Sequence, residues 1–375
     1  QNTAVGYGAL TANTTASYNT AVGSNSLLDN TTGAQNTAIG YNTLENNTTA
    51  SFNTAVGSET LFTNTTGANN VAVGQAVMYQ NTTGDQNTAM GNSALNKNTT
   101  GSYNTAIGNQ ALENSTTGGG NVAVGWKALE ANTTASDNTA VGRQALYANT
   151  TGQYNTAVGR SALISNTTAD YNTAFGRQAL YAATTGGSNV ALGPNALVSV
   201  VTGSFNLAIG RNALSANTGS DNMAIGNDAG DALTTGVRNI GIGVSALSTQ
   251  STAGYNTAIG WHALRLNTTG QEHVAVGQNS LSSNTTGTQN TALGGGTLQN
   301  NTTGSQNTAV GRDALLSNNG SGNTAVGMDA LNDNTTGTRN TALGTYALDA
   351  STTASDNTAI GYDALGGGSL SGSDN

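Results

Sequence analysis

The chain repeats itself every 17 residues, and this period constrains its fold more than any other feature. A glycine preceded by an apolar residue and, in all but one copy, by Ala before that recurs 22 times between Gly6 and Gly361, and only the steps ending at Gly226 and Gly327 are 16 residues long. A short fixed period is the signature of a solenoid, in which each repeat buries its apolar face against its neighbours. The sequence therefore predicts an all-β parallel solenoid, one coil per repeat, as a single continuous array over residues 1–375.

The repeats align on the consensus NTAVGxxALxxNTTGxx, whose positions we call slots 1 to 17. Slot 4 is always apolar, slot 3 is Ala except at Gly241, and slot 9 is Leu except at Met78 and Gly230, whereas slot 10 accepts any residue. Slots 1 to 5 are typical of a strand buried on both faces, and slots 8 to 11 of a strand with one solvated face. The simplest interpretation is a flattened coil with two short parallel strands.

Two turns are expected in each coil. Slot 6 follows the repeated glycine and holds the only proline, Pro194, so we expect a bend there. The second turn is NTTG, because both 16-residue repeats lose a residue at this point, at 217–219 and 318–320. A strand could not lose a residue without turning its side chains to the other face.

Polar ladders are expected to supplement a thin core, since aromatic residues make up only 5% of the chain. Slot 1 is Asn in every repeat except at His273. Coils stacked about 4.8 Å apart allow such side chains to hydrogen-bond along the stack as an amide ladder. Threonines of slots 13 and 14 can form similar ladders or turn bonds.

Slot 3 predicts association between chains. If slots 2 and 4 face the leucine of slot 9, slot 3 points away from the core and should vary, yet it admits only Ala or Gly. A second copy of the chain packed against it would explain this restriction. The candidate oligomer contacts are Ala38, Ala106, Ala157 and Ala258. In the inverse arrangement slot 3 faces inward and slots 2 and 4 face the partner, and a lone solenoid with a cramped interior is the remaining alternative.

The repeat resembles the YadA-like head repeats of trimeric autotransporter adhesins and the NTAIG…NTTG arrays in fibre proteins of phages and bacteria. The closest local matches are NTAIGYNTLENNTT from Asn36 and NTAIGWHALRLNTT from Asn256, and the likeness extends over the whole chain. The resemblance implies a left-handed parallel β-roll, three chains wide, in an adhesive extracellular fibre. The unit here is longer than in those heads, by residues in NTTG, and no coiled-coil stalk, membrane anchor or chaperone segment is recognisable.

Several functional classes are disfavoured. A net charge of −9 argues against nucleic-acid binding, and the absence of Cys excludes disulfides and cysteine zinc sites. No apolar stretch predicts a membrane span. His262 and His273 fall in different slots, and no catalytic residue, metal site or cofactor is expected. Because the chain opens within a repeat, we interpret it as part of a longer protein.

Two surface stripes are candidate contacts for glycans or anions. Slot 6 carries the candidate residues Arg143, Arg160, Arg177, Arg211, Trp126 and Trp261. Slot 17 carries further aromatic residues, including Tyr154 and Tyr171. Arginine rows can hold anionic glycans and exposed rings can pack on sugars, although a solvated edge is the plainer interpretation. Asn-Thr-Thr, a formal glycosylation acceptor, occurs 13 times, and turn formation explains it better.

The expected function is therefore structural: the shaft of an extracellular trimeric fibre, either a phage tail fibre or a bacterial surface adhesin. Its partners would be copies of itself and, through other parts of the protein, host surface glycans. The alternatives are a carbohydrate-binding module that acts through the slot 6 stripe and an ice-binding solenoid with Thr rows. Catalysis is the least expected function.

Overall fold

The computed structural model describes residues 1–367 and divides into two units, Gln1–Ser188 and a second that begins at Asn189. Both units are stacks of coils, 17 residues long except for the two 16-residue repeats of the second unit, and each coil has one three-residue strand in slots 2 to 4. The predicted all-β parallel solenoid with one coil per repeat is confirmed. Residues 368–375, the end of the expected array, lie outside the described part.

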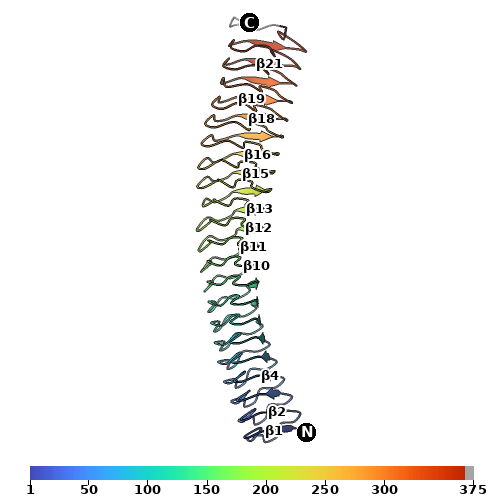
Figure 1. Ribbon diagram of the computed structural model, residues 1–375, viewed down its shortest axis with the longest axis vertical. Coiled ribbons are helices and arrows are strands. Elements are labelled where there is room, and N and C mark those ends of the chain that lie inside the picture. The colour runs from blue at the N-terminus through green and yellow to red at the C-terminus, as the bar shows by residue number, and fades with distance from the viewer. Residues whose placement is uncertain (368–375) are drawn as a thin grey trace. The chain divides into compact units, whose positions relative to one another are not determined.

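The N-terminal unit contains eleven strands, which Figure 1 shows stacked in chain order. They are β1 (Thr3–Val5), β2 (Thr20–Val22), β3 (Thr37–Ile39), β4 (Thr54–Val56), β5 (Val71–Val73), β6 (Thr88–Met90), β7 (Thr105–Ile107), β8 (Val122–Val124), β9 (Thr139–Val141), β10 (Thr156–Val158) and β11 (Thr173–Phe175).

The C-terminal unit contains eleven more strands among its described residues. They are β12 (Val190–Leu192), β13 (Leu207–Ile209), β14 (Met223–Ile225), β15 (Ile240–Ile242), β16 (Thr257–Ile259), β17 (Val274–Val276), β18 (Thr291–Leu293), β19 (Thr308–Val310), β20 (Thr324–Val326), β21 (Thr341–Leu343) and β22 (Thr358–Ile360).

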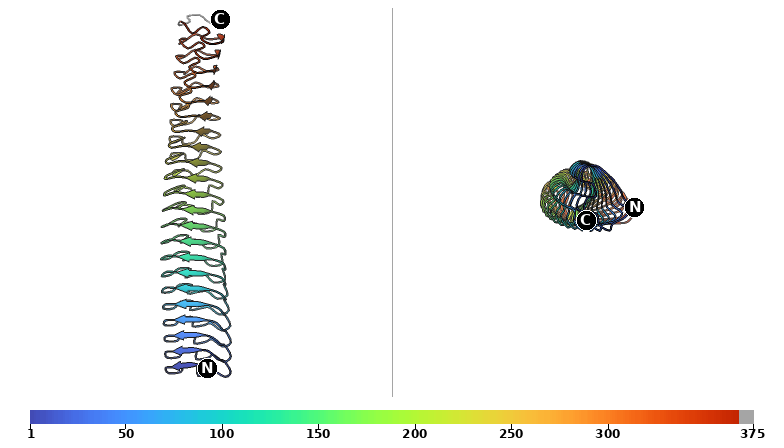
Figure 2. Two further views of the ribbon diagram at one scale, coloured as in Figure 1. Left: turned by 90° about the vertical axis from the view of Figure 1, so that its right-hand side faces the viewer. Right: turned by 90° about the horizontal axis from the view of Figure 1, so that it is seen from below.

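Within each unit every strand pairs in parallel with the strand of the next coil, residue for residue. Thr105 faces Val122 across β7 and β8, and Val274 faces Thr291 across β17 and β18. The strands of each unit therefore form one row along one side of its coils, as Figure 2 shows. This register places the same slot of successive coils side by side.

The second strand expected in each coil is absent from the described residues. Slots 7 and 9 adopt left-handed backbone conformations, as at Lys127 with φ 56° and Leu129 with φ 52°, and these bends interrupt an extended strand. Backbone hydrogen bonds between coils persist, because Leu112 N–H donates to the Ala128 carbonyl at 3.0 Å. Slots 7 to 11 thus stack as turns, and Leu of slot 9 still points inward as expected.

The repeated glycine of slot 5 is required by the stacking. Gly108 has φ 135°, and a Cβ built on it would lie 2.5 Å from the carbonyl oxygen of Gly125 in the next coil. A side chain here would meet both backbone strain and a clash with backbone. The bend predicted after this glycine is confirmed by the turn that begins there.

The interior is lined by slots 3, 8 and 9, and this corrects the expected direction of slot 3. Ala106, Ala111 and Leu112 are fully buried in one coil. Side chains alternate along a strand, so slots 2 and 4 face outward. Slot 3 is restricted to Ala or Gly because the interior is narrow, which fits both the inverse arrangement and a lone solenoid.

Two asparagine ladders complete the interior. In slot 1, Asn53 N–H donates to Oδ1 of Asn36 at 2.9 Å, and Asn53 Nδ2 donates to the Gly67 carbonyl at 2.9 Å. In slot 12, Asn64 Nδ2 donates to Oδ1 of Asn47 at 3.0 Å. The predicted amide ladder of slot 1 is confirmed, and the ladder of slot 12 is additional. These bonds satisfy amide groups that would otherwise be costly to bury.

The 16-residue repeats lose their residue in the NTTG turn, as predicted. Leu207 pairs with Met223 and Thr308 with Thr324, so the strands keep their register across both deletions. In the second case, Asn319 Oδ1 accepts hydrogen bonds from the Thr302 N–H and hydroxyl, each at 2.7 Å. A side-chain carbonyl thereby replaces the backbone carbonyl that threonine supplies in other coils, such as Thr99 to the Thr82 hydroxyl.

Candidate functional site

The strands of each unit expose slots 2 and 4 on the side away from the core, a surface we call the strand face. In the N-terminal unit the slot 4 residues Ile107, Met90 and Phe175 are 38%, 47% and 53% exposed. Slot 4 is apolar in all 22 repeats even though water reaches it, while slot 6, which is mostly exposed, and slot 10, which is mostly half-buried, vary freely. A row of apolar side chains that never becomes polar is typical of a contact surface.

The four alanines predicted as oligomer contacts lie in the interior instead. Ala38, Ala106, Ala157 and Ala258 are each fully buried within their own coil stack. They cannot touch another chain, and that prediction is wrong. The strand face takes their place as the candidate contact surface.

The slot 6 stripe brings together four of the six predicted residues, all in the N-terminal unit. Trp126, Arg143, Arg160 and Arg177 occupy successive coils and are exposed. The Arg143 guanidinium lies 4.9 Å from the centre of the Trp126 ring. Among residues 1–367, none of these three arginines forms an ion pair with a carboxylate. We call Arg143, Arg160 and Arg177 the arginine row.

The other two members of the stripe have different surroundings. Arg211 in the C-terminal unit pairs with Asp228 at 3.1 Å, which neutralises its charge. Trp261 is 46% exposed, and its ring stacks on His262 with 3.6 Å between centroids. Partial burial and the Arg265 charge lower the pKa of His262.

The two histidines are separated as predicted, one on the surface and one inside. His273 replaces Asn in the slot 1 ladder: its Nε2 lies 2.8 Å from the Gly287 carbonyl, and its Nδ1 accepts the Asn290 N–H at 3.2 Å. Burial lowers the pKa of His273 to about 4. The ring is neutral at physiological pH and performs the structural role of an asparagine.

The Asn-Thr-Thr segments form turns, as the sequence indicated. In each, the asparagine Nδ2 donates to the slot 15 carbonyl of its own coil, as in Asn166 to Ala169 at 3.1 Å. All of these asparagines except Asn13 are buried. The nitrogen that would carry a glycan is therefore inside the stack and already bonded.

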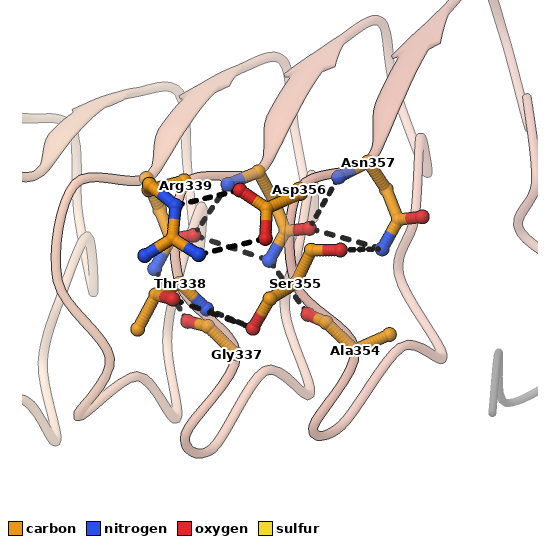
Figure 3. A network of polar contacts seen from close by, with 9 residues as sticks. Gly337, Thr338, Arg339, Ala354, Ser355, Asp356 and Asn357 are labelled. Carbon is orange, nitrogen blue, oxygen red and sulfur yellow. Dashed lines mark hydrogen bonds and ion pairs between the residues drawn. The ribbon is translucent and has the colours of Figure 1, made fainter. Parts of the chain in front are cut away.

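The corner formed by slots 15 to 17 is rich in polar contacts, and Figure 3 shows it for two coils. Arg339 donates two hydrogen bonds to Asp356, at 2.6 and 2.7 Å, and this pairing lowers the pKa of the Asp356 carboxyl. The Thr338 N–H donates to Ser355 Oγ at 3.0 Å. In the N-terminal unit, the slot 17 rings of Tyr154 and Tyr171 stack at 5.1 Å. These groups bind one another across coils, which favours a structural role.

One feature was missed in the sequence: a notch of about 310 Å³ in the C-terminal unit. It lies where Gly295 and Gly296 leave slots 6 and 7 without side chains. Its walls come from polar residues of the coils on either side, including Gln278 and Arg312. The sequence feature that could have revealed the notch is a pair of adjacent glycines in slots 6 and 7, because almost all of the remaining repeats carry side chains in both slots.

Within residues 1–367, no group of three or more acidic, His or Cys side chains could hold a metal ion. The same residues include no helix with the length and hydrophobicity needed to cross a membrane. Comparison with protein-family models and with curated proteins finds no match to this chain. The candidate surfaces are thus the strand face, the arginine row and the notch.

Proposed function

We propose that the chain is a structural shaft of an extracellular fibre, a homotrimer whose chains associate through their strand faces. The single observation that carries this proposal is slot 4, which is apolar in all 22 repeats although none of its side chains is buried in the coil stack. A partner chain covering this face would remove that apolar area from water, which is favourable. The likeness to YadA-like heads and to fibre repeats supports three chains and an extracellular location.

Charge introduced on the strand face tests association. Changing Met90, Ile107 and Val124 together to Lys places three cations in successive coils, at a surface where burying a charge is costly. We expect sedimentation equilibrium to give three times the chain mass for the parent protein and one chain mass for the variant. Circular dichroism should remain unchanged, because these side chains point away from the core.

A matched control places three lysines on the variable side of neighbouring coils. Gln75, Asn92 and Asn109 are exposed and uncharged in slot 6, and their replacement by Lys should leave the trimer intact. A well-folded parent protein that sediments as a monomer would refute the proposal. Equal dissociation of both variants would show that association does not depend on the strand face.

The arginine row supports a second candidate, a module that binds anionic glycans. Its three guanidinium groups lie in neighbouring coils without carboxylate partners in the described part of the chain. Guanidinium binds sulfate and carboxylate groups well. Saturable binding to an immobilised sulfated glycan, lost in Arg160→Ala and weakened by salt, would favour this function over a purely structural one.

The ice-binding alternative has less support. The slot 13 threonines use their hydroxyls within the stack, as in Thr65, which donates to the Thr82 carbonyl at 3.0 Å. These groups are therefore committed to holding the coils together. We propose the shaft as the main function.

A further inference from the structure

The notch interrupts the slot 6 row of the C-terminal unit at the coil that contains β18. The coil before it contributes Gln278 and Asn279, and the coil after it contributes Arg312 and Asp313. Gln299, from slot 10 of the central coil, completes the lining. A volume of about 310 Å³ is at the lower end of the range for small-molecule sites.

The two glycines have different parts in forming this notch. A Cβ built on Gly295 would come no closer than 4.0 Å to any other group, so the space above it is open. A Cβ on Gly296 would collide with the Asp313 carboxylate, so this glycine makes room for that side chain. Backbone bonds from Gly296 to Gln278 and from Asp313 to Gly295 hold the three coils together at 2.9 and 3.0 Å.

The lining groups match the hydroxyls of an uncharged sugar. Gln278, Asn279 and Gln299 each supply an amide that can both donate and accept hydrogen bonds. Arg312 Nε lies 2.9 Å from Asp313 Oδ2, so the only two charges in the notch neutralise each other. Dense donors and acceptors without net charge favour a neutral polyhydroxylated ligand over an anion.

An aromatic surface adjoins the notch along the same row. Trp261 occupies slot 6 of the coil that precedes Gln278, and the Asn279 N–H donates to the Trp261 carbonyl at 2.9 Å, which shows that these coils are adjacent. The indole is 46% exposed and is supported on one side by His262. A flat, supported ring beside a polar notch can pack against the C–H face of a sugar.

We infer that this region binds a neutral oligosaccharide, with one sugar on Trp261 and another, two coils further along the row, in the notch above Gly295. All of its residues belong to the C-terminal unit, and the inference does not depend on the fibre role. At this site a pocket interrupts the slot 6 row near an exposed tryptophan.

The chain allows a test that fills the notch with little risk to folding. Slot 6 accepts methionine at Met328, and the backbone at Gly295 is not left-handed, so Gly295→Met should fold and occupy the site. The matched control is Ser58→Met, the same slot in the N-terminal unit. Gln299→Ala removes one lining amide from slot 10, which accepts any residue, and provides a second variant.

The full chain in its native assembly is applied to an array of neutral gluco-, manno- and galacto-oligosaccharides of two to four units, with sialylated and sulfated glycans for comparison. Calorimetry then measures the dissociation constant of the tightest neutral ligand. We expect Gly295→Met to weaken binding at least tenfold, and Trp261→Ala and Gln299→Ala to weaken it severalfold. Ser58→Met and Tyr41→Ala, an exposed slot 6 ring elsewhere, should bind like the parent protein.

Three results would overturn the inference. The first is that no neutral oligosaccharide binds. The second is that Gly295→Met or Trp261→Ala binds as tightly as the parent protein while retaining its melting temperature. The third is a preference for acidic glycans that is lost in Arg160→Ala, which would place binding at the arginine row. None of these results bears on trimer formation, which sedimentation tests separately.

Discussion

Asn98 has a buried side-chain oxygen without a hydrogen-bond donor because Ser115 stands in the next coil, where an asparagine would donate to it. In the preceding coils the slot 12 ladder runs unbroken from Asn30 to Asn98, where Asn98 Nδ2 donates to Asn81 Oδ1 at 2.6 Å. The same defect leaves the side-chain oxygens of Asn166 and Asn334 without partners, before Ala183 and Ser351. We therefore expect the coil stack to be less stable at the coils where slot 12 is not asparagine.

Ser115→Asn should repair this ladder and stabilise the N-terminal unit. The new amide would donate to Asn98 and accept from Asn132, whose Nδ2 now reaches Ser115 Oγ at only 3.5 Å. A net gain of about 1 kcal/mol is typical for a buried hydrogen bond. Urea unfolding measures this change in the free energy of unfolding. Asn81→Ser creates the same defect elsewhere in the ladder, and we expect it to lower the free energy of unfolding by a similar amount. A loss of stability in Ser115→Asn would contradict the ladder.

His273 should make stability depend on pH between about 4 and its ordinary value of 6.5. The folded chain keeps the ring neutral, so the unfolded chain binds the extra proton in this window, and stability falls as pH falls. A difference of this size corresponds to roughly 3 kcal/mol at the acidic end. Urea unfolding of His273→Asn, which restores the common ladder residue, should lack this component, whereas the surface variant His262→Asn should retain it. If the free energy of unfolding of His273→Asn depends on pH in the same way as that of the parent protein, the role of His273 in this pH dependence is wrong.

Ala106→Phe should destabilise the coil stack itself, since this alanine is fully buried beside Leu112. Overpacking a core costs typically about 1–3 kcal/mol, and the narrow interior has no alternative space. Glu113→Phe in slot 10 of the same coil should have little effect. Measuring both in the background of the strand-face lysine variant separates folding from association. If Ala106→Phe matters only in the assembled protein, the interior assignment is wrong.

The Asn-Thr-Thr segments should resist glycosylation in the folded protein. Asn149 Nδ2 already donates to Gly152 and to Asn132 Oδ1, at 2.9 and 3.2 Å, inside the stack. An oligosaccharyltransferase acting on purified folded chain should therefore add no glycan at Asn149, whereas a peptide of the same sequence should be modified. Mass spectrometry reads both, and efficient modification of the folded chain would show that the turns open readily.

The period and the turn-confined deletions were sufficient to predict the stacking, the register and the slot 1 ladder, because these depend only on repetition. The direction of slot 3 could not be settled from the sequence, since a small residue is required both by a narrow interior and by a close partner. The prediction of a second strand was wrong because an Ala-Leu pattern does not indicate the left-handed backbone conformation of residues such as Leu112, which has φ 51°.

The candidate sites arise from residues that differ between coils, and a consensus of the repeats does not show such differences. The arginines of slot 6 were visible in the sequence, but the pairing of Arg211 with Asp228 requires the adjacent coil to be placed beside it. The notch arises because Gly295 and Gly296 have no side chains. It can be recognised as a pocket only when the coils on both sides, which form its walls, are placed beside it.

The tolerance of the NTTG turn to a lost residue has a genetic consequence. Residue-for-residue pairing means that a crossover between any two aligned repeats of the gene rejoins the chain with every strand still opposite its neighbour. A crossover misaligned by one codon is absorbed if it falls in the turn, as at Asn319, whose side chain replaces the lost carbonyl. The number of repeats in the gene can therefore change while the encoded chain still folds. Coils with distinctive surfaces, such as the one that contains Gly295, can be gained or lost as whole repeats.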